Sequence, residues 1–428
     1  MEVKYFARNP LTPNLFRSTF SLKFIISVGI FLRVLTLLLL PNTPSSLAPD
    51  EGTYARLVSW LASGNSALSF PEFGDGLFRS GRFLIVPSIA LNHLGLSSLD
   101  AVRVVSLVFS VFNIFLFNKF LNAISEDVKY SRFKKIVLLV YVFLPSHLVW
   151  GTLGLRESIN EFGVLVTFYF LKMVLKDSEG NKIIQIAMLI LGLSITFNIR
   201  PQVGLMLALI VVFSILLNYW KQPLIVFSIF LFPILNLLAN SVPLGIPKVA
   251  ENITSKVATS PTYVLDFIQY KRNGNQQFAN SQIVISDCNE DQTRFTNLRC
   301  EITRLPIAIL HVTLRPMPIY DRDSSAQIAA GLENLFWIFI SVFILLHLKK
   351  LFRKRHFIFE VPAAVFIALF TVAAALYEGN VGTAFRHKGL LLPLFLLIAV
   401  SLYTEKSLQM PRSVFSKGMK KKISSGGL

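Results

Sequence analysis

Two pairs of acidic residues stand beside long apolar runs in this chain. Asp50 and Glu51 are adjacent in "APDEGTYARL", whereas Glu157 and Glu161 in "GLRESINE" are four residues apart and so share a helix face. Carboxylates near hydrocarbon are costly unless something uses them. At one interface they can act as a general base or bind a divalent cation, Mg or Mn, with Asp50 and Glu157 as the expected ligands. Each pair also suits the first turn of a helix, where the helix dipole stabilises negative charge, and this structural interpretation stays open.

Cationic residues also cluster beside apolar runs. Arg200 lies in "NIRPQ", and three cationic or titratable residues follow one another in "NVGTAFRHKG". Arg and Lys at the level of the lipid headgroups can bind a lipid phosphate or pyrophosphate, and Arg offers a bidentate fork. The alternative is ordinary snorkelling of long side chains to the membrane interface. The candidate substrate-binding residues are Arg200, Arg386, His387, Lys388, Arg79 and Arg82.

Two histidines lie near these clusters, but their surroundings favour packing over chemistry. His93 and His147 each stand alone in an apolar stretch, where a histidine is usually a packed or interfacial side chain. No His-x-x-x-His or Cys-x-x-Cys spacing indicates a further metal site.

The composition indicates the class of protein to which these charged residues belong. The chain has 428 residues, of which 53% are hydrophobic and only 15% are charged, and this excludes a conventional soluble domain. The formal net charge is +18, but the Lys and Arg residues are spread over short segments between apolar runs instead of forming one basic face. A nucleic-acid partner is therefore not expected. The sequence predicts an all-α, polytopic membrane protein surrounded by lipid.

About ten apolar runs have the length of transmembrane helices. They cover residues 21–40, 102–120, 135–151, 158–176, 182–198, 202–219, 222–240, 332–348, 357–377 and 389–404. Basic segments flank these runs at 129–135, 172–182, 349–356 and 417–422. Because basic loops of membrane proteins face the cytoplasm, both termini are expected there and the charged clusters on the external side, in the plasma membrane of a bacterium.

One further apolar segment, residues 83–96, must not cross the membrane if the basic loops are to share one side. It has only 14 residues and contains Pro87 and His93, which also argues against a crossing. We therefore expect residues 41–101 to form one external loop with two membrane-hugging helices, at about residues 50–63 and 83–96.

This topology divides the chain into four parts. They are a membrane catalytic module at 1–240, an external lobe at 241–331, C-terminal transmembrane helices at 332–404 and a basic cytoplasmic tail at 405–428. The external lobe contains the only two cysteines of the chain, Cys288 and Cys300. A disulfide between them is expected in an oxidising compartment, and two unpaired thiols are the alternative.

The order of these features resembles the GT-C superfamily of integral membrane glycosyltransferases, which includes protein O-mannosyltransferases and bacterial lipid A aminoarabinose transferases. The resemblance rests on the acidic pair in the first external loop, the helix that follows it, the Pro-containing apolar segment and the Arg-led span "DAVRVVSLV". It covers roughly residues 20–220, and it implies a GT-C-like helical bundle in which Asp50-Glu51 and Glu157 line the active site. The chain departs from the superfamily in "RES", where many members have Asp, and in lacking a His-Pro-Pro-Leu-like stretch.

These observations predict an inverting hexosyl- or pentosyltransferase. It would move a sugar from a polyprenyl-phosphate carrier to a glycan, lipid or protein acceptor on the external face of the membrane. Asp50 or Glu51 would be the general base and Glu157 the second acid. The residues expected to hold the carrier phosphate are Arg200, Arg386 and Lys388.

Two other functions use similar features. A polysaccharide polymerase or ligase of the O-antigen type would depend on the external cations and not on the first-loop acids. A transporter of a lipid-linked glycan would need charges deep within its spans, yet the central parts of these spans hold few ionisable residues apart from Arg33.

Overall fold

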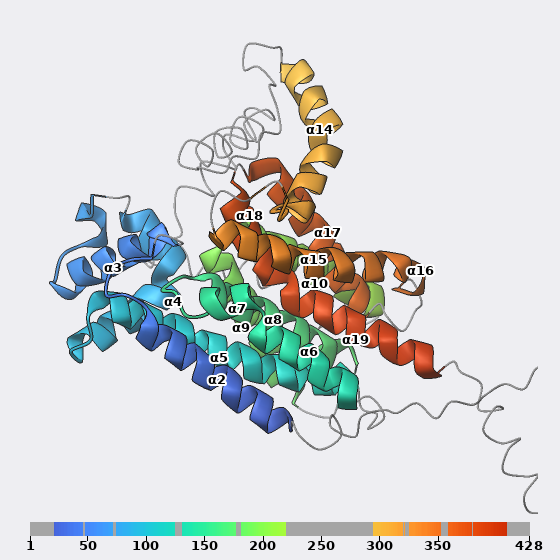
Figure 1. Cartoon of the computed structure of the whole chain (residues 1–428), viewed down its shortest axis with the longest axis horizontal. Coiled ribbons are helices and arrows are strands. Elements are labelled where there is room, and N and C mark those ends of the chain that lie inside the picture. Colours follow the sequence, from blue (N-terminus) through green and yellow to red (C-terminus); the bar gives the residue numbers. More distant parts are fainter. Residues whose placement is uncertain are drawn as a thin grey trace, which may run out of the picture.

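The protein is all-helical over the residues that the computed structural model describes. These are residues 21–45, 48–71, 74–124, 131–176, 181–219, 294–319, 321, 325–351, 358–378 and 380–408. The regular elements in these ranges are helices, and none is a β-strand. The helices pack into one bundle, as Figure 1 shows, and the predicted all-α class is confirmed for this part of the chain.

Eight helices in the described ranges are long and apolar enough to cross a membrane, as expected of a multi-pass membrane protein. Seven of them are α2 (Leu22–Leu39), α5 (Ser98–Ile124), α8 (Glu157–Leu175), α9 (Lys182–Ile199), α10 (Pro201–Tyr219), α15 (Ser325–Leu346) and α17 (Glu360–Tyr377). The eighth joins α18 (Val381–Lys388), the short 3-10 helix η4 (Gly389–Leu391) and α19 (Leu392–Leu408). Each corresponds to one of the predicted runs.

The other two predicted spans have different outcomes. Residues 135–151, expected as one span, lie in two helices, α6 (Ser131–Phe143) and α7 (Pro145–Trp150). Pro145 separates them because a proline has no backbone N–H with which to continue the preceding helix, and it is well suited to begin a new one. The predicted span at 222–240 lies outside the described residues.

The loop predicted to be external contains two helices at one end of the bundle, α3 (Pro49–Ala62) and α4 (Gly74–His93), with η1 (Ala67–Ser69) between them (Figure 1). α3 begins where the sequence predicts, with Pro49 in its first turn and two acids beside it. α4 begins earlier than predicted, and it is not among the eight helices able to cross a membrane. Both loop helices share a hydrophobic core with Ile195 and Ile199 of α9, so the loop is packed against the end of α9.

The predicted external lobe is described only from α14 (Arg294–Leu314) onward. Ala308 and Val312, near the C-terminal end of α14, belong to the main core of the bundle. Cys300 in α14 is disulfide-bonded. Its predicted partner, Cys288, lies outside the described residues. The short helix α16 (Leu348–Leu351) follows α15.

Candidate functional site

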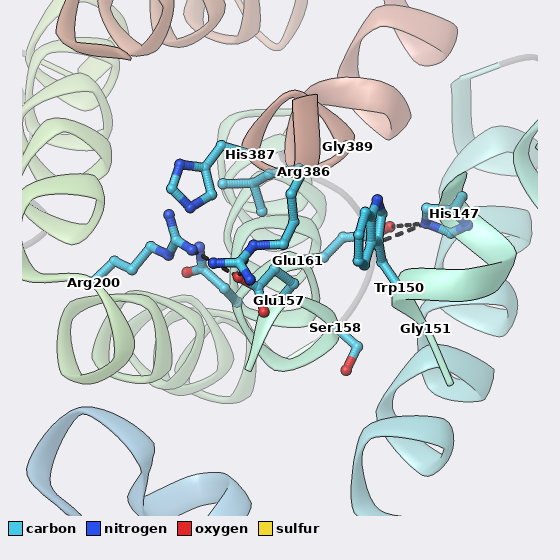
Figure 2. Close-up of a pocket in the computed structure, with 12 residues that line it drawn as sticks. His147, Trp150, Gly151, Glu157, Ser158, Glu161, Arg200, Arg386, His387 and Gly389 are labelled. Carbon is cyan, nitrogen blue, oxygen red and sulfur yellow. Dashed lines mark hydrogen bonds and ion pairs between the residues drawn. The ribbon is translucent and has the colours of Figure 1, made fainter. Parts of the chain in front are cut away.

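A small cavity lies where α7, α8, the α9–α10 junction and α18 meet (Figure 2). It offers about 30 Å³ to the centres of water-sized molecules, which is room for about two waters. Its wall consists of His147, Trp150, Gly151, Glu157, Ser158, Asn160, Glu161, Arg200, Arg386, His387, Gly389 and Leu390. Most of these side chains are polar, and they come from four separate parts of the chain.

Glu157, the first residue of α8, lies at the centre of the charges in this wall. Its Oε1 accepts a hydrogen bond from Arg200 Nη2 at 2.9 Å and lies 3.2 Å from Arg386 Nε. The three side chains are only 15%, 7% and 11% exposed, so their charges attract more strongly than they would in water. Arg200 is placed here because α9 ends at this residue and Pro201 begins α10.

Asp50 reaches the same charges from the first turn of α3. Its Oδ2 accepts a hydrogen bond from Arg386 Nη2 at 3.2 Å, although the two residues are 336 positions apart. Asp50 is 57% exposed whereas Arg386 is 11% exposed, so the carboxylate stands on the solvent side. The structure thus brings together four of the predicted site residues, Asp50, Glu157, Arg200 and Arg386, which we call the acid–arginine cluster.

Glu51 has a different environment from its neighbour. It is fully buried, and its carboxylate accepts hydrogen bonds from Arg103 Nε and Nη2 at 2.8 and 3.0 Å and from the backbone N–H groups of Gly154 and Ser45 at 2.8 and 3.0 Å. Burial alone would raise the pKa of Glu51, but these hydrogen bonds and the Arg103 charge hold it below the ordinary value. Glu51 therefore ties the loop to α5 and to the turn before α8, and of the two adjacent acids only Asp50 contacts a cavity-lining residue, Arg386.

His387 is held in the cavity wall by Glu378, an acid that the sequence did not single out. His387 Nδ1 hydrogen-bonds to Glu378 Oε1, and Thr383 Oγ1 donates to Glu378 Oε2 at 2.7 Å. Burial of Glu378 would raise its pKa, but the charge and hydrogen bond of His387, the Thr383 hydroxyl and the charge of Arg200 keep the pKa below its ordinary value. The imidazole is therefore fixed beside the acid–arginine cluster.

Three predicted substrate-binding residues do not line the cavity: Lys388, Arg79 and Arg82. Lys388 Nζ donates to Asn334 Oδ1 and to the carbonyl of Thr313, both at 2.8 Å, and so links α18 to α14 and α15. Arg82 on α4 donates to Asn198 near the end of α9. The lysine and Arg82 therefore hold helices together in this structure.

His147 and Glu161, on the other side of the cavity in Figure 2, belong to a buried network that also contains Arg33 of α2. Arg33 Nη2 meets His147 Nδ1 at 3.1 Å, and His147 Nε2 lies 3.0 Å from both oxygens of Glu161. The hydroxyl of Tyr141 also donates to Glu161, and Arg33 Nε donates to Ser110 Oγ at 2.9 Å. This set, the Arg33 network, joins α2, α5, α6, α7 and α8 behind the cavity.

Sequence reasoning missed Trp150 and Asn160. Trp150 Nε1 and Asn160 Oδ1 are buried atoms of cavity-lining residues, and they have no hydrogen-bond partner within the described part of the chain. Glu157 Oε2 and Arg200 Nε are also buried and have no hydrogen-bond partner within the described residues. Buried polar atoms are normally paired, so unpaired ones in a cavity wall are available to a ligand. An Asn or a Trp at the end of an apolar run carries no local signal of such a role.

The described residues contain no group of three or more His, Cys, Asp and Glu side chains placed to hold a metal ion. The two predicted metal ligands, Asp50 and Glu157, both pair with Arg386. A divalent cation would have to displace this guanidinium to reach the two carboxylates together. Mg or Mn binding at Asp50 and Glu157 stays a prediction.

No protein-family model matches this chain, and no curated protein matches it either. The resemblance to the GT-C superfamily therefore rests on the residues themselves, chiefly on Asp50, Glu157 and the order of the elements around them. What the protein does must be inferred from the chemistry of the cavity.

Proposed function

We propose that this protein is a membrane glycosyltransferase that takes a sugar from a polyprenyl-phosphate carrier and joins it to an acceptor hydroxyl on the external face of the membrane. The acid–arginine cluster is the observation that carries the proposal. It combines an exposed carboxylate, Asp50, with two arginines, Arg200 and Arg386, at a cavity between apolar helices. Such a cluster provides a phosphate-binding fork and a general base within a few ångströms of each other.

The two carboxylates that contact Arg386 support the phosphate site. Its Nη2 faces Asp50 and its Nε faces Glu157, so carboxylate oxygens stand where phosphate oxygens would bind the same fork. Arg386 Nε lies in an ion pair but makes no hydrogen bond within the described residues, and neither does Arg200 Nε. Both atoms can therefore donate to a ligand.

The cavity must widen before a donor enters, and the geometry favours one route. The Asp50–Arg386 pair is the most exposed contact of the acid–arginine cluster, and exposed ion pairs contribute only about 0–1 kcal/mol. The donor phosphate, a diester with one negative charge and two free oxygens, competes with Asp50 for the Arg386 fork and displaces it. Glu157, which is less exposed, stays with Arg200 and keeps both guanidinium groups in place.

Displacement from Arg386 leaves the Asp50 carboxylate beside the bound donor. Asp50 accepts the proton of the acceptor hydroxyl while the acceptor oxygen forms a bond to the anomeric carbon. The bond from that carbon to the phosphate oxygen breaks, and its electron pair leaves with the polyprenyl phosphate. Arg200 and Arg386 stabilise the charge on this leaving group, and attack from the opposite face inverts the anomeric configuration.

The proposal can be tested without knowing the acceptor, because the released carrier is common to all acceptors. The purified full-length protein in proteoliposomes would receive farnesyl phosphate carrying glucose, galactose, mannose or arabinose, together with a cell-envelope extract as the source of acceptor. Release of farnesyl phosphate is measured by mass spectrometry. We expect Asp50→Asn to lower the release rate by about 100-fold or more, since general-base catalysis contributes about 10²–10⁴-fold.

Asp100→Asn is the matched control, because Asp100 also lies in the first turn of a helix but its carboxylate accepts a hydrogen bond from Ser97 instead of from Arg386. It should keep full activity. Full activity in Asp50→Asn would remove the proposed base and favour a polymerase or ligase that depends on the cations. Movement of the intact probe across the membrane without release would identify a transporter instead.

A further inference from the structure

Trp150, Asn160 and Glu161 form one part of the cavity lining, which we call the polar wall, and the first two each carry a buried hydrogen-bonding atom that no residue of the described chain uses. Asn160 is only 1% exposed, yet its Oδ1 accepts no hydrogen bond from the described residues. Trp150 Nε1 is a buried donor that also has no partner among them. All three residues line the cavity. An indole N–H and an amide oxygen together suit a ligand group that both accepts and donates hydrogen bonds, as a sugar hydroxyl does.

The Arg33 network determines the charge of this wall. A guanidinium has only N–H donors, so His147 Nδ1 must accept from Arg33, and the imidazole proton lies on Nε2. His147 Nε2 and the Tyr141 hydroxyl then both donate to Glu161, which acts as an acceptor carboxylate. The positive charge of Arg33 lies behind His147 and away from the cavity lining, whereas Glu161 is part of that lining.

The two sides of the cavity therefore differ in what they can bind. The side with Arg200 and Arg386 favours an anion, and the side with Glu161 disfavours one because like charges repel in a site withdrawn from water. A neutral polyhydroxylated group meets a donor, an amide acceptor and a carboxylate acceptor on the polar wall. A carboxylate-bearing sugar would meet Glu161.

We propose that the polar wall binds the glycosyl group of the donor and selects an uncharged sugar over a uronic acid, with Trp150 and Asn160 as the residues that determine this specificity. The inference rests on the proposed function, since the acid–arginine cluster must hold the phosphate for the sugar to reach this wall. It assigns to the donor a substrate class that the phosphate site alone does not define.

The test separates sugar binding from phosphate binding. The full-length protein in nanodiscs is titrated with farnesyl methyl phosphate, a phosphodiester with one negative charge, and with the diesters in which glucose, galactose, mannose or glucuronic acid replaces the methyl group, and each dissociation constant is measured. We expect at least one neutral-sugar probe to bind about three- to ten-fold tighter than farnesyl methyl phosphate, the gain expected from one neutral hydrogen bond. The glucuronyl probe should bind no tighter than farnesyl methyl phosphate.

Two variants locate this gain. Asn160→Ala removes the amide, and Trp150→Phe removes the N–H and part of the indole while keeping an aromatic ring. Each should reduce the gain for the neutral sugar and leave the affinity for farnesyl methyl phosphate within about twofold, since a neutral hydrogen bond is removed and no phosphate contact changes. Asn118→Ala is the matched control, because Asn118 Oδ1 is also buried without a partner in the described residues but Asn118 does not line the cavity.

The outcomes distinguish the inference from the proposed function. The inference is overturned if no neutral sugar binds tighter than farnesyl methyl phosphate, if the full gain survives in both variants, or if the glucuronyl probe binds as tightly as the neutral ones. In each of these cases the proposed phosphate site still stands if the wild type binds farnesyl methyl phosphate and Arg386→Ala does not. A wild-type protein that does not bind farnesyl methyl phosphate overturns the proposed function and the inference together.

Discussion

Replacing Glu51 with Gln should destabilise the fold far more than replacing its neighbour Asp50 with Asn. Glu51 is fully buried and accepts hydrogen bonds from Arg103, Gly154 and Ser45. Gln keeps the size of the side chain but removes its charge and turns an amide NH₂ toward other donors, so Arg103 is left buried with an unpaired charge. Breaking a buried ion pair in this way costs about 3–5 kcal/mol. Asp50 is 57% exposed, and its ion pair contributes only about 0–1 kcal/mol.

The free energy of unfolding of each variant can be measured in mixed micelles by titration with sodium dodecyl sulfate, followed by tryptophan fluorescence. Arg103→Met and the Glu51→Gln/Arg103→Met double variant complete a thermodynamic cycle. The double variant should cost less than the sum of the single variants, because it leaves neither charge unpaired. A Glu51→Gln protein as stable as Asp50→Asn, or single costs that simply add, would refute the structural role assigned to Glu51.

Two other perturbations test the groups around the cavity. Arg33→Met should lower the free energy of unfolding by roughly 3–5 kcal/mol in the same titration, since His147 loses the hydrogen bond from Arg33 and the Glu161 carboxylate behind it loses its compensating charge. A second substitution, Glu161→Gln, should recover part of the loss. The pKa of Glu378 lies below its ordinary value of 4.5, so its ionised form stabilises the fold above about pH 5, and this contribution disappears as the pH falls through the folded-state pKa. The difference in unfolding free energy between the wild type and Glu378→Gln should therefore shrink between about pH 6 and pH 3. A difference that stays constant over this range would contradict the Glu378–His387 contact.

Local patterns in the sequence were enough to predict most of the membrane helices. A long apolar run can satisfy its backbone groups in hydrocarbon only as a helix, so hydropathy and length predict such elements directly. The same reasoning did not predict that residues 135–151 are divided into two helices, because an average over apolar residues does not register the break that Pro145 imposes. It also placed the start of α4 at residue 83 instead of Gly74, because the first turns of that helix, from Gly74 to Arg82, are polar and do not resemble an apolar run.

The sequence also identified which charged residues stand at the ends of helices, since such residues are expensive elsewhere in a membrane protein. It could not distinguish the roles of Asp50 and Glu51, because both suit the first turn of α3 equally well. Adjacent residues on a helix point about 100° apart, so one carboxylate faces Arg386 and the other faces Arg103.

Only the tertiary structure decided these pairings. The partners of Asp50 and Glu51 lie 336 and 52 positions away, and no local pattern encodes contacts of that separation. The same holds for Lys388, which follows Arg386 by two positions and therefore points to another side of the helix, where it meets Thr313 and not the cavity. The sequence by itself determined where charges sit along the helices, and the packing of those helices determined which charges support the fold and which remain for a ligand.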